Sequence, residues 1–220
     1  ALLKSSIAKK LAMALSGLFL ITFLALHFFI NMTSVFSSET FNTMSHFMGY
    51  NPLIQFVMQP ILVAGVVFHF VMGFILELKN RSARPIGYVK YDGAANASWA
   101  SRNMIVSGLV VLAFLGLHFY DFWVHEMTYK YVEGNVDATE TTRFWEELHA
   151  KFADVWRVAL YVISFVLLGL HLAHGFQSSF QSVGARHPKY TPVLKAFGTW
   201  YSILIPAGFI FIAVYHFLTQ

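Results

Sequence analysis

Four histidines lie deep inside four separate apolar stretches, and they are the residues best placed to do chemistry: His27, His69, His118 and His171. An imidazole in the hydrocarbon of a bilayer is costly, so a histidine there points to a functional site. One histidine in each of four stretches predicts two sites, each with two imidazole ligands to a metal. Haem held by axial imidazoles is the metal carrier that best suits a bundle of apolar helices. The pattern therefore predicts a membrane-embedded cytochrome b with two haems b.

Five apolar stretches must position these histidines, and each is long enough to cross a hydrocarbon core of about 30 Å. None shows the alternating pattern of a barrel strand, so the sequence predicts helices. The last stretch contains Pro206, which a membrane helix tolerates as a kink. The predicted spans lie near Leu11–Val35, Leu53–Leu78, Met104–Val124, Val155–Phe176 and Trp200–Leu218.

Composition predicts one all-α transmembrane domain over residues 1–220. The chain is 57% hydrophobic and 12% charged, which is too apolar for a soluble domain. It has no cysteine, which excludes disulfides, iron–sulfur ligation and cysteine-bound zinc within the chain. The net charge of +4 does not indicate nucleic-acid binding, because the basic residues flank the apolar stretches. We find no internal repeat beyond a weak likeness of the second and fourth spans. We also expect a short amphipathic helix around Thr142–Phe152.

The basic residues predict the orientation in the membrane. Four of them, diluted by acidic residues, lie on the side of the C-terminus: Lys130, Arg143, Lys151 and Arg157. The other eleven lie on the side of the N-terminus: Lys4, Lys9, Lys10, Lys79, Arg81, Arg84, Lys90, Arg102, Arg186, Lys189 and Lys195. Cytoplasmic loops carry the excess of lysine and arginine, so the N-terminus is expected in the cytoplasm and the C-terminus outside.

The running directions of the helices sort the four histidines into two levels. At a rise of about 1.5 Å per residue, His27 lies roughly 24 Å and His118 roughly 21 Å from the inner ends of their spans. The second and fourth spans start at the outer face, and His69 and His171 each lie sixteen residues after the start of their span. Both histidines therefore lie near the inner face. The two levels are then roughly 15 Å apart along the membrane normal. This predicts two stacked haems that form an electron path across the membrane.

The inner pair shares a second feature, the pattern His-x-x-x-Gly, at His69–Gly73 and His171–Gly175. Such a glycine either clears the helix face for a flat macrocycle or packs against a neighbouring helix, as small residues do in membranes. Both interpretations stay open on the sequence. His174 is the rival of His171, three residues further on. The glycine spacing and the depth favour His171.

Three segments give the chain a resemblance to a known family: the entry segment Ser6–Gly17, His27 followed by Asn31, and the segment His171–Gly184. Over nearly its whole length the chain resembles the single-subunit, five-helix, dihaem cytochrome b anchor of bacterial succinate dehydrogenases and fumarate reductases. In that family the first and third helices bind the distal haem, and the second and fourth bind the proximal haem. The resemblance thus implies the same four ligands to haem iron: His27, His118, His69 and His171.

The resemblance also implies the partners and the reaction. A flavoprotein carrying FAD and an iron–sulfur subunit would dock on the cytoplasmic face of the bacterial inner membrane. Succinate would be oxidised to fumarate on the flavoprotein, and this chain would pass electrons between the iron–sulfur subunit and quinone, usually menaquinone. One departure is Gly169, where some fumarate reductases carry a glutamate used for transmembrane proton movement. The departure favours succinate oxidation as the physiological direction.

Quinone chemistry needs hydrogen-bonding or protonating groups near a haem edge. His46, Gln55 and Gln59 are the leading candidates, because they lie at the outer end of the predicted bundle and a histidine can exchange protons there. The alternatives are that these are ordinary interfacial residues, or that quinone binds at the inner end near Lys9 and Ser16. Other polar groups at the outer end are Asn31, Asn51 and Asp121.

Two other functions stay open. The first is a dihaem cytochrome b of another oxidoreductase, such as the anchor of a hydrogenase or formate dehydrogenase, or a transmembrane ascorbate-type reductase. The second is a proton-coupled transporter with a histidine relay. A transporter predicts discontinuous helices with acidic partners at mid-depth, and neither is visible in the sequence. The five spans and the segment His171–Gly184 favour the succinate dehydrogenase family.

Overall fold

The computed structural model describes residues 5–82, 103–135, 141–185 and 187–220, and within these ranges it is all helix and turn, with no strand. The all-α prediction is therefore confirmed for the described part of the chain. The long helices are α1 (Ser6–Phe36), α3 (Gln59–Ser82), α5 (Met104–His118), α8 (Val155–Ser182) and α9 (Thr191–Leu218). The short ones are α2 (Ser38–Tyr50), α6 (His125–Met127) and α7 (Arg143–Lys151), with π-helical segments η2 (Ile54–Met58), η3 (Phe119–Val124) and η4 (Thr128–Val132).

Five helical stretches are long and apolar enough to cross a membrane, as predicted. They run over Ile7–Phe36, Ile54–Ser82, Met104–Val132, Val155–Ser182 and Thr191–Leu218. The third continues past the predicted end at Val124, because η3, α6 and η4 extend α5 without a break. The fifth begins nine residues before Trp200, with Pro192 in its first turn, where a missing N–H costs nothing.

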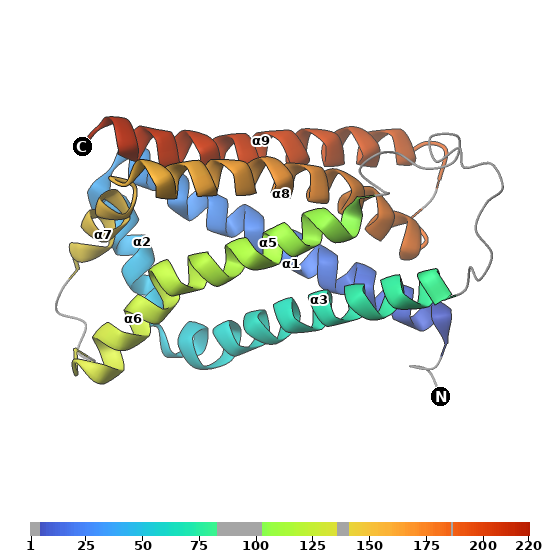
Figure 1. The fold of residues 1–220 in the computed structure, drawn as a ribbon, viewed down its shortest axis with the longest axis horizontal. Helices are drawn as coiled ribbons and strands as arrows, with labels where there is room; N and C mark the ends of the chain where they lie inside the picture. Colours follow the sequence, from blue (N-terminus) through green and yellow to red (C-terminus); the bar gives the residue numbers. More distant parts are fainter. Residues whose placement is uncertain (1–4, 83–102, 136–140, 186) are drawn as a thin grey trace.

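The long helices lie side by side, and the two chain ends lie at opposite ends of the bundle (Figure 1). We call these the N end and the C end. The helix α9 packs along α8, α1 contacts α3, α8 and α9, and α5 packs on α8. The helix α3 lies at the edge of the bundle and contacts α1 and α5 (Figure 1). The short helices α2, α6 and α7 gather at the C end.

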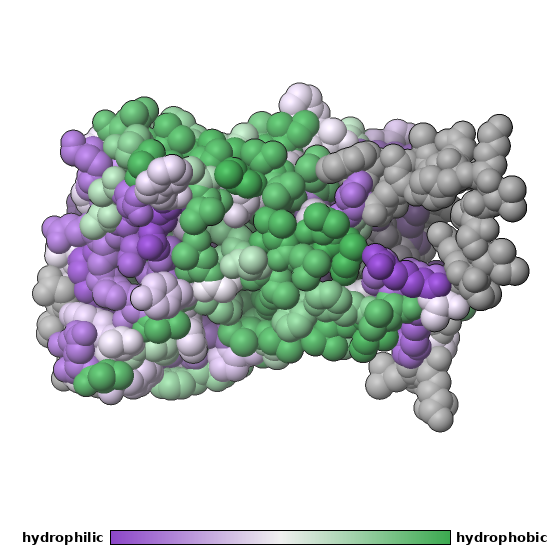
Figure 2. Space-filling view, in the orientation of Figure 1, coloured by the Kyte–Doolittle hydropathy of each residue, from purple (hydrophilic) through white to green (hydrophobic). Residues whose placement is uncertain are grey.

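The middle of the bundle presents an apolar surface, whereas hydrophilic residues gather at the C end (Figure 2). Large side chains such as Phe29, Phe68, Leu160 and Ile203 are exposed on different helices. Contiguous apolar surface of this extent marks a membrane or protein contact rather than contact with water. Together with the five spans, it shows the character of a multi-pass membrane protein.

The helices α8 and α9 approach closely at Gly169. A Cβ atom added there would lie 3.0 Å from the carbonyl oxygen of Ser202. That carbonyl has no intrahelical N–H partner four residues on, because residue 206 is proline. The freed carbonyl thus faces the bare backbone of Gly169. A glutamate at this position, as in some fumarate reductases, would not fit without a shift of α9.

The C end is closed by the short helices. The predicted amphipathic helix is confirmed as α7, whose Leu148 is buried together with Phe152, the residue that follows the helix. The helix α2 was not predicted, because its sequence Ser38–Tyr50 is mostly polar. The Ser37 hydroxyl caps it by accepting a hydrogen bond from the Thr40 backbone N–H at 3.1 Å.

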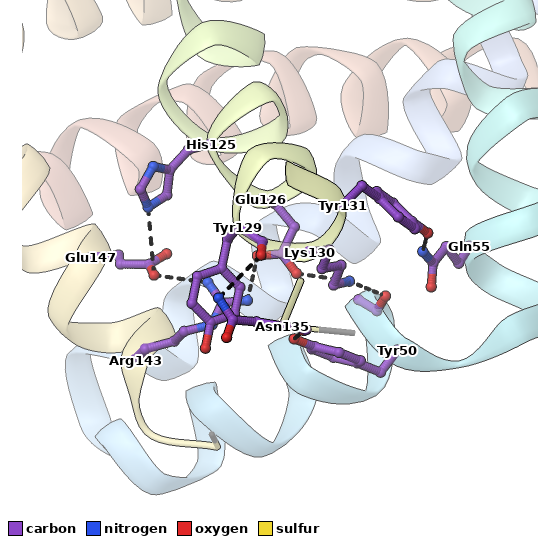
Figure 3. Close-up of polar contacts among 11 residues, drawn as sticks. Tyr50, Gln55, His125, Glu126, Tyr129, Lys130, Tyr131, Asn135, Arg143 and Glu147 are labelled. Carbon is purple, nitrogen blue, oxygen red and sulfur yellow. Dashed lines mark hydrogen bonds and ion pairs between the residues drawn. The ribbon is translucent and has the colours of Figure 1, made fainter. Parts of the chain in front are cut away.

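A buried ion-pair network links these short helices (Figure 3). The Lys130 ammonium, 1% exposed, lies 2.8 Å from Glu126 and donates a hydrogen bond to the Gly49 carbonyl at 2.6 Å. The Arg143 guanidinium pairs with Glu126 and, at 2.8 Å, with Glu147. Two basic residues assigned to the C-terminal side are thus internal to the C end rather than free surface charges.

The charge of Arg143 is secured by these partners. Burial acts to lower its pKa, but hydrogen bonds and charge attraction from Glu147 and Glu126 outweigh burial and raise the pKa above the usual value. The Arg143 guanidinium therefore stays charged at any physiological pH.

Five basic residues that count towards the predicted orientation lie outside the described residues: Lys4, Arg84, Lys90, Arg102 and Arg186.

Candidate functional site

The four histidines form two facing pairs. His27 of α1 faces His118 of α5, with ring centroids 5.6 Å apart and ring planes at 87°. His69 of α3 faces His171 of α8, with ring centroids 6.4 Å apart and ring planes at 71°. We call these the C-end pair and the N-end pair. The structure thus brings together the same residues that the depth calculation paired.

The two pairs lie at different levels of the bundle. On α1 the side chain of Ser16 contacts His69 of the N-end pair, and His27 of the C-end pair follows eleven residues later. At about 1.5 Å per residue, eleven residues correspond to about 16 Å along the helix. The helix α5 repeats this spacing, with Ser107 contacting His171 and His118 following eleven residues later.

The N-end pair is held by serine hydroxyls. Ser16 Oγ lies 3.0 Å from Nδ1 of His69, and Ser107 Oγ lies 3.3 Å from Nδ1 of His171. Each hydroxyl also donates to the backbone carbonyl three residues earlier in its own helix, at 2.8 Å for Ser16 and 3.0 Å for Ser107. The ring that faces His69 belongs to His171. The N-end pair therefore contains His171, which the sequence favoured over His174.

The C-end pair is enclosed by aromatic rings instead. His27 stacks on Phe23 at 5.5 Å and lies 5.8 Å from Phe209. His118 lies 5.2 Å from Phe122, and its Nδ1 atom is buried with no hydrogen-bond partner. A buried polar atom without a partner costs about 1–3 kcal/mol. The protein alone therefore leaves part of the bonding capacity of this pair unused.

A buried carboxylate lies one turn beyond His118. Asp121 is 1% exposed, forms an ion pair with Arg157 and accepts a hydrogen bond from the Tyr161 hydroxyl at 2.8 Å. The Tyr161 ring in turn lies 6.4 Å from the ring of His118. Asp121 belongs to η3, which starts directly after His118, and π-helical segments inside α-helices often mark functional sites.

The two glycines after the N-end histidines face methionines of neighbouring helices. A Cβ atom at Gly73 would lie 3.6 Å from the Met13 methyl carbon, and one at Gly175 would lie 3.6 Å from the Met104 methyl carbon. Each glycine surface is thus covered by a methionine from the neighbouring helix. A Cβ atom would be in ordinary van der Waals contact at both positions, so both interpretations of His-x-x-x-Gly stay open.

These contacts extend the weak likeness of the second and fourth spans to an internal repeat that also includes the first and third spans. The repeat divides these four helices into two halves, α1 with α3 and α5 with α8. The first helix of each half carries Met-x-x-Ser-Gly, with a histidine eleven residues after the serine. The second helix of each half carries His-x-x-x-Gly, and the methionine and serine contacts between the two helices are the same in both halves. The residues are Met13, Ser16, Gly17 and His27 in α1, and Met104, Ser107, Gly108 and His118 in α5.

A cavity of about 790 Å³ lies between α3 and the C-end part of the third span. Its polar side chains are Gln55, Gln59, Trp123 and Tyr131, and the Gln55 side-chain amide donates to the Tyr131 hydroxyl. Its apolar wall is exposed to the membrane face of the bundle and includes Phe56, Val67, Phe68 and Val71. The cavity thus opens on the apolar surface of the bundle. The three π-helical segments supply Gln55, Trp123 and Tyr131.

Two of the three predicted quinone contacts, Gln55 and Gln59, line this cavity, and the third does not. His46 lies on α2, where its ring stacks on Tyr50 at 4.7 Å. Sequence reasoning missed Tyr131, because it lies beyond Val124, where the third span was expected to end. It also missed Trp123, which lies inside that span and was counted only as one of its apolar residues.

The chain was also compared with protein families, curated proteins and solved structures, and none of them matches it. Its function is therefore inferred from the site itself.

Proposed function

We propose that the chain is a dihaem cytochrome b in which His27 and His118 hold one haem b and His69 and His171 hold the other. The observation that carries the proposal is the two facing imidazole pairs, stacked in an apolar bundle. Imidazole–metal bonds of about 2 Å place the two ligand nitrogens about 4 Å apart. Ring centroids lie further back than the nitrogens, so the 6.4 Å separation of the N-end pair suits one iron between the rings, whereas the C-end rings, at 5.6 Å, would have to move slightly apart to hold one.

The donor set fits haem rather than a free metal ion. Among the described residues no third histidine or carboxylate joins either pair to complete a four-ligand site. Two imidazoles are the full axial set of a haem iron, since the macrocycle supplies the other four nitrogens. When bound, haem supplies reversible one-electron transfer. The chain orients the imidazoles and surrounds the C-end pair with Phe23, Phe122 and Phe209, which exclude water.

We further propose that the chain is the membrane anchor of a succinate:quinone oxidoreductase of the bacterial inner membrane. The support is the resemblance of its segments, the five spans and the basic residues described at the N end, which include Lys9, Lys10 and Arg81. The N end would then face the cytoplasm and the FAD-containing and iron–sulfur partners. Electrons from succinate would pass first to the N-end pair and then to the C-end pair.

Quinone, with menaquinone as the first candidate, would be reduced in the cavity beside α3 at the level of the C-end pair. The cavity combines an apolar wall for an isoprenoid tail with amide, indole and phenol groups that can bind the ring oxygens. Gln55 and Gln59 remain the leading contacts, joined by Tyr131. His46 on α2 is not among the residues that line the cavity, so we do not propose it as a direct quinone contact.

The purified chain is expected to contain two low-spin b haems. Pyridine-haemochrome absorbance measured against protein mass tests this, and a ratio near one haem per chain would contradict the two-pair assignment. Reduced-minus-oxidised spectra without any haem signal would instead favour a transporter. Co-purification with a covalently flavinylated subunit would separate the succinate dehydrogenase assignment from the anchors of hydrogenases or formate dehydrogenases.

Replacing Gln59 with leucine is expected to lower quinone-linked turnover about tenfold, because losing one hydrogen bond of about 1.4 kcal/mol changes an equilibrium constant by that factor. Succinate oxidation measured with an artificial dye, and both haem spectra, should not change. His46→Ala is the control, since His46 lies at the same end but outside the cavity. A loss confined to the His46 variant would place the quinone at α2.

A further inference from the structure

We propose that Ser16 and Ser107 are positioning residues for the N-end haem, each fixing the ring orientation and the tautomer of one axial histidine. This inference rests on the proposed haem function and deepens it, since it assigns a role to residues that would not touch the iron. The serines lie on α1 and α5, whereas the histidines that they contact lie on α3 and α8. Each contact is therefore an inter-helix contact within one half of the chain.

The direction of the hydrogen bonds determines the tautomer. A serine hydroxyl has a single hydrogen, and in both serines that hydrogen is directed to the carbonyl of Met13 or Met104. With that hydrogen on the carbonyl, the oxygen is left to accept from the imidazole, and we infer that Nδ1 of His69 and of His171 carries the hydrogen. In a neutral imidazole the other nitrogen is then the acceptor. Both rings are thus prepared to present Nε2, with its lone pair, to a metal.

The glycine after each serine lies next to the same ring. A Cβ atom at Gly17 would lie 3.5 Å from Cε1 of His69, and one at Gly108 would lie 3.4 Å from Cε1 of His171. Each ring therefore lies beside the glycine of the neighbouring helix while its Nδ1 atom reaches the serine hydroxyl of that helix. The same arrangement occurs in both halves, although the apolar residues between the repeated positions differ. Two matched occurrences are hard to explain as packing by chance.

Neither histidine of the C-end pair has a serine hydroxyl against its Nδ1 atom, so this pair serves as an internal comparison. Nδ1 of His118 has no hydrogen-bond partner, and the Asn31 amide lies 3.5 Å from both ring nitrogens of His27. A hydrogen bond from the ring N–H to an acceptor raises the basicity of the ligating nitrogen. A more basic ligand stabilises ferric over ferrous iron. Removal of a serine hydroxyl should therefore raise the midpoint potential of the N-end haem and leave the C-end haem unchanged.

The test uses the whole chain in its complex, with Ser16→Ala, Ser107→Ala and the double variant. Second-shell losses change metal affinity by about 10–100-fold. A tenfold change in the ratio of ferric to ferrous affinity shifts a one-electron potential by about 59 mV. We expect each single variant to raise one of the two potentials, and the double variant to raise the same one further. The low-spin electron paramagnetic resonance signal of that haem should shift as well, because it depends on the angle between the axial ring planes.

Two further variants keep the result interpretable. Ser16→Thr retains a hydroxyl and should restore the wild-type potential. Ser164→Ala is the matched control, since Ser164 is also nearly buried on a long helix and donates to its own helix at 2.7 Å. Unchanged potentials and resonance signals in both alanine variants, with two haems bound, would overturn the inference and leave the proposed function standing. Equal damage by alanine and threonine would also overturn it, whereas a wild-type chain without haem would refute the proposed function itself.

Discussion

Replacing His171 with alanine is expected to leave one haem in the chain instead of two. Alanine offers no lone pair to the iron, and His69 alone would hold a haem through one axial bond only. The loss should be confined to the N end, because the C-end pair lies about 16 Å away along the helices. His69→Ala should give the same result, whereas His27→Ala and His118→Ala should remove the other haem. Electron transfer from succinate to quinone should fall to background in all four variants.

Haem content and redox titration of the four variants measure this effect. The control is His174→Ala, because His174 lies three residues from His171 on the same helix and yet is not the ring that faces His69. It should keep both haems. If His174→Ala loses the N-end haem and His171→Ala retains it, the ligand assignment on α8 must be reversed.

Replacing Arg157 with methionine is expected to destabilise the folded chain by about 3–5 kcal/mol, the usual cost of leaving one member of a buried ion pair without its partner. The affected charge is Asp121, whose side chain has no exposed surface. Tyr161 would remain as its partner, with a single hydrogen bond. The effect should also reach the C-end haem, since Tyr161 lies against the ring of His118.

Unfolding in detergent micelles, followed by haem absorbance, measures this loss of stability. The double variant Asp121→Asn with Arg157→Met should recover most of it, because no buried charge is left unpaired. Tyr161→Phe should cost only about 1 kcal/mol, the net value of a typical hydrogen bond. An Arg157→Met chain as stable as the wild type would show that solvent or lipid headgroups already neutralise Asp121.

The spans and the histidine pairing could be predicted from the sequence because both depend on properties that it states directly. Apolar length identifies a span, and a fixed helical rise converts residue number into depth. Antiparallel helices then leave only one way to pair His27, His69, His118 and His171 by level. No side-chain packing enters this reasoning, which is why it succeeds without coordinates.

The remaining features depend on contacts between distant residues. The third span was expected to end at Val124, because Glu126 and Lys130 are charged, yet these two residues pair with each other inside the C end. The cavity that Tyr131 helps to line was hidden for the same reason. The repeat escaped notice because its few positions are separated by apolar residues that any membrane helix could carry. Its signal was present in the sequence as Ser-Gly eleven residues before a histidine in two helices.

The repeat has a consequence for how the protein is made. Each histidine pair takes one ring from the half that contains α1 and α3 and one from the half that contains α5 and α8. If the pairs hold haem as proposed, neither haem could gain both axial ligands before the second half has been synthesised and inserted. Within α3 only Met72 is fully buried, so this helix has little packing of its own to hold it in place. A ligand that binds only the folded state stabilises it. Haem binding would then be a late step in folding, which holds α3 against the other helices and links the two halves of the chain.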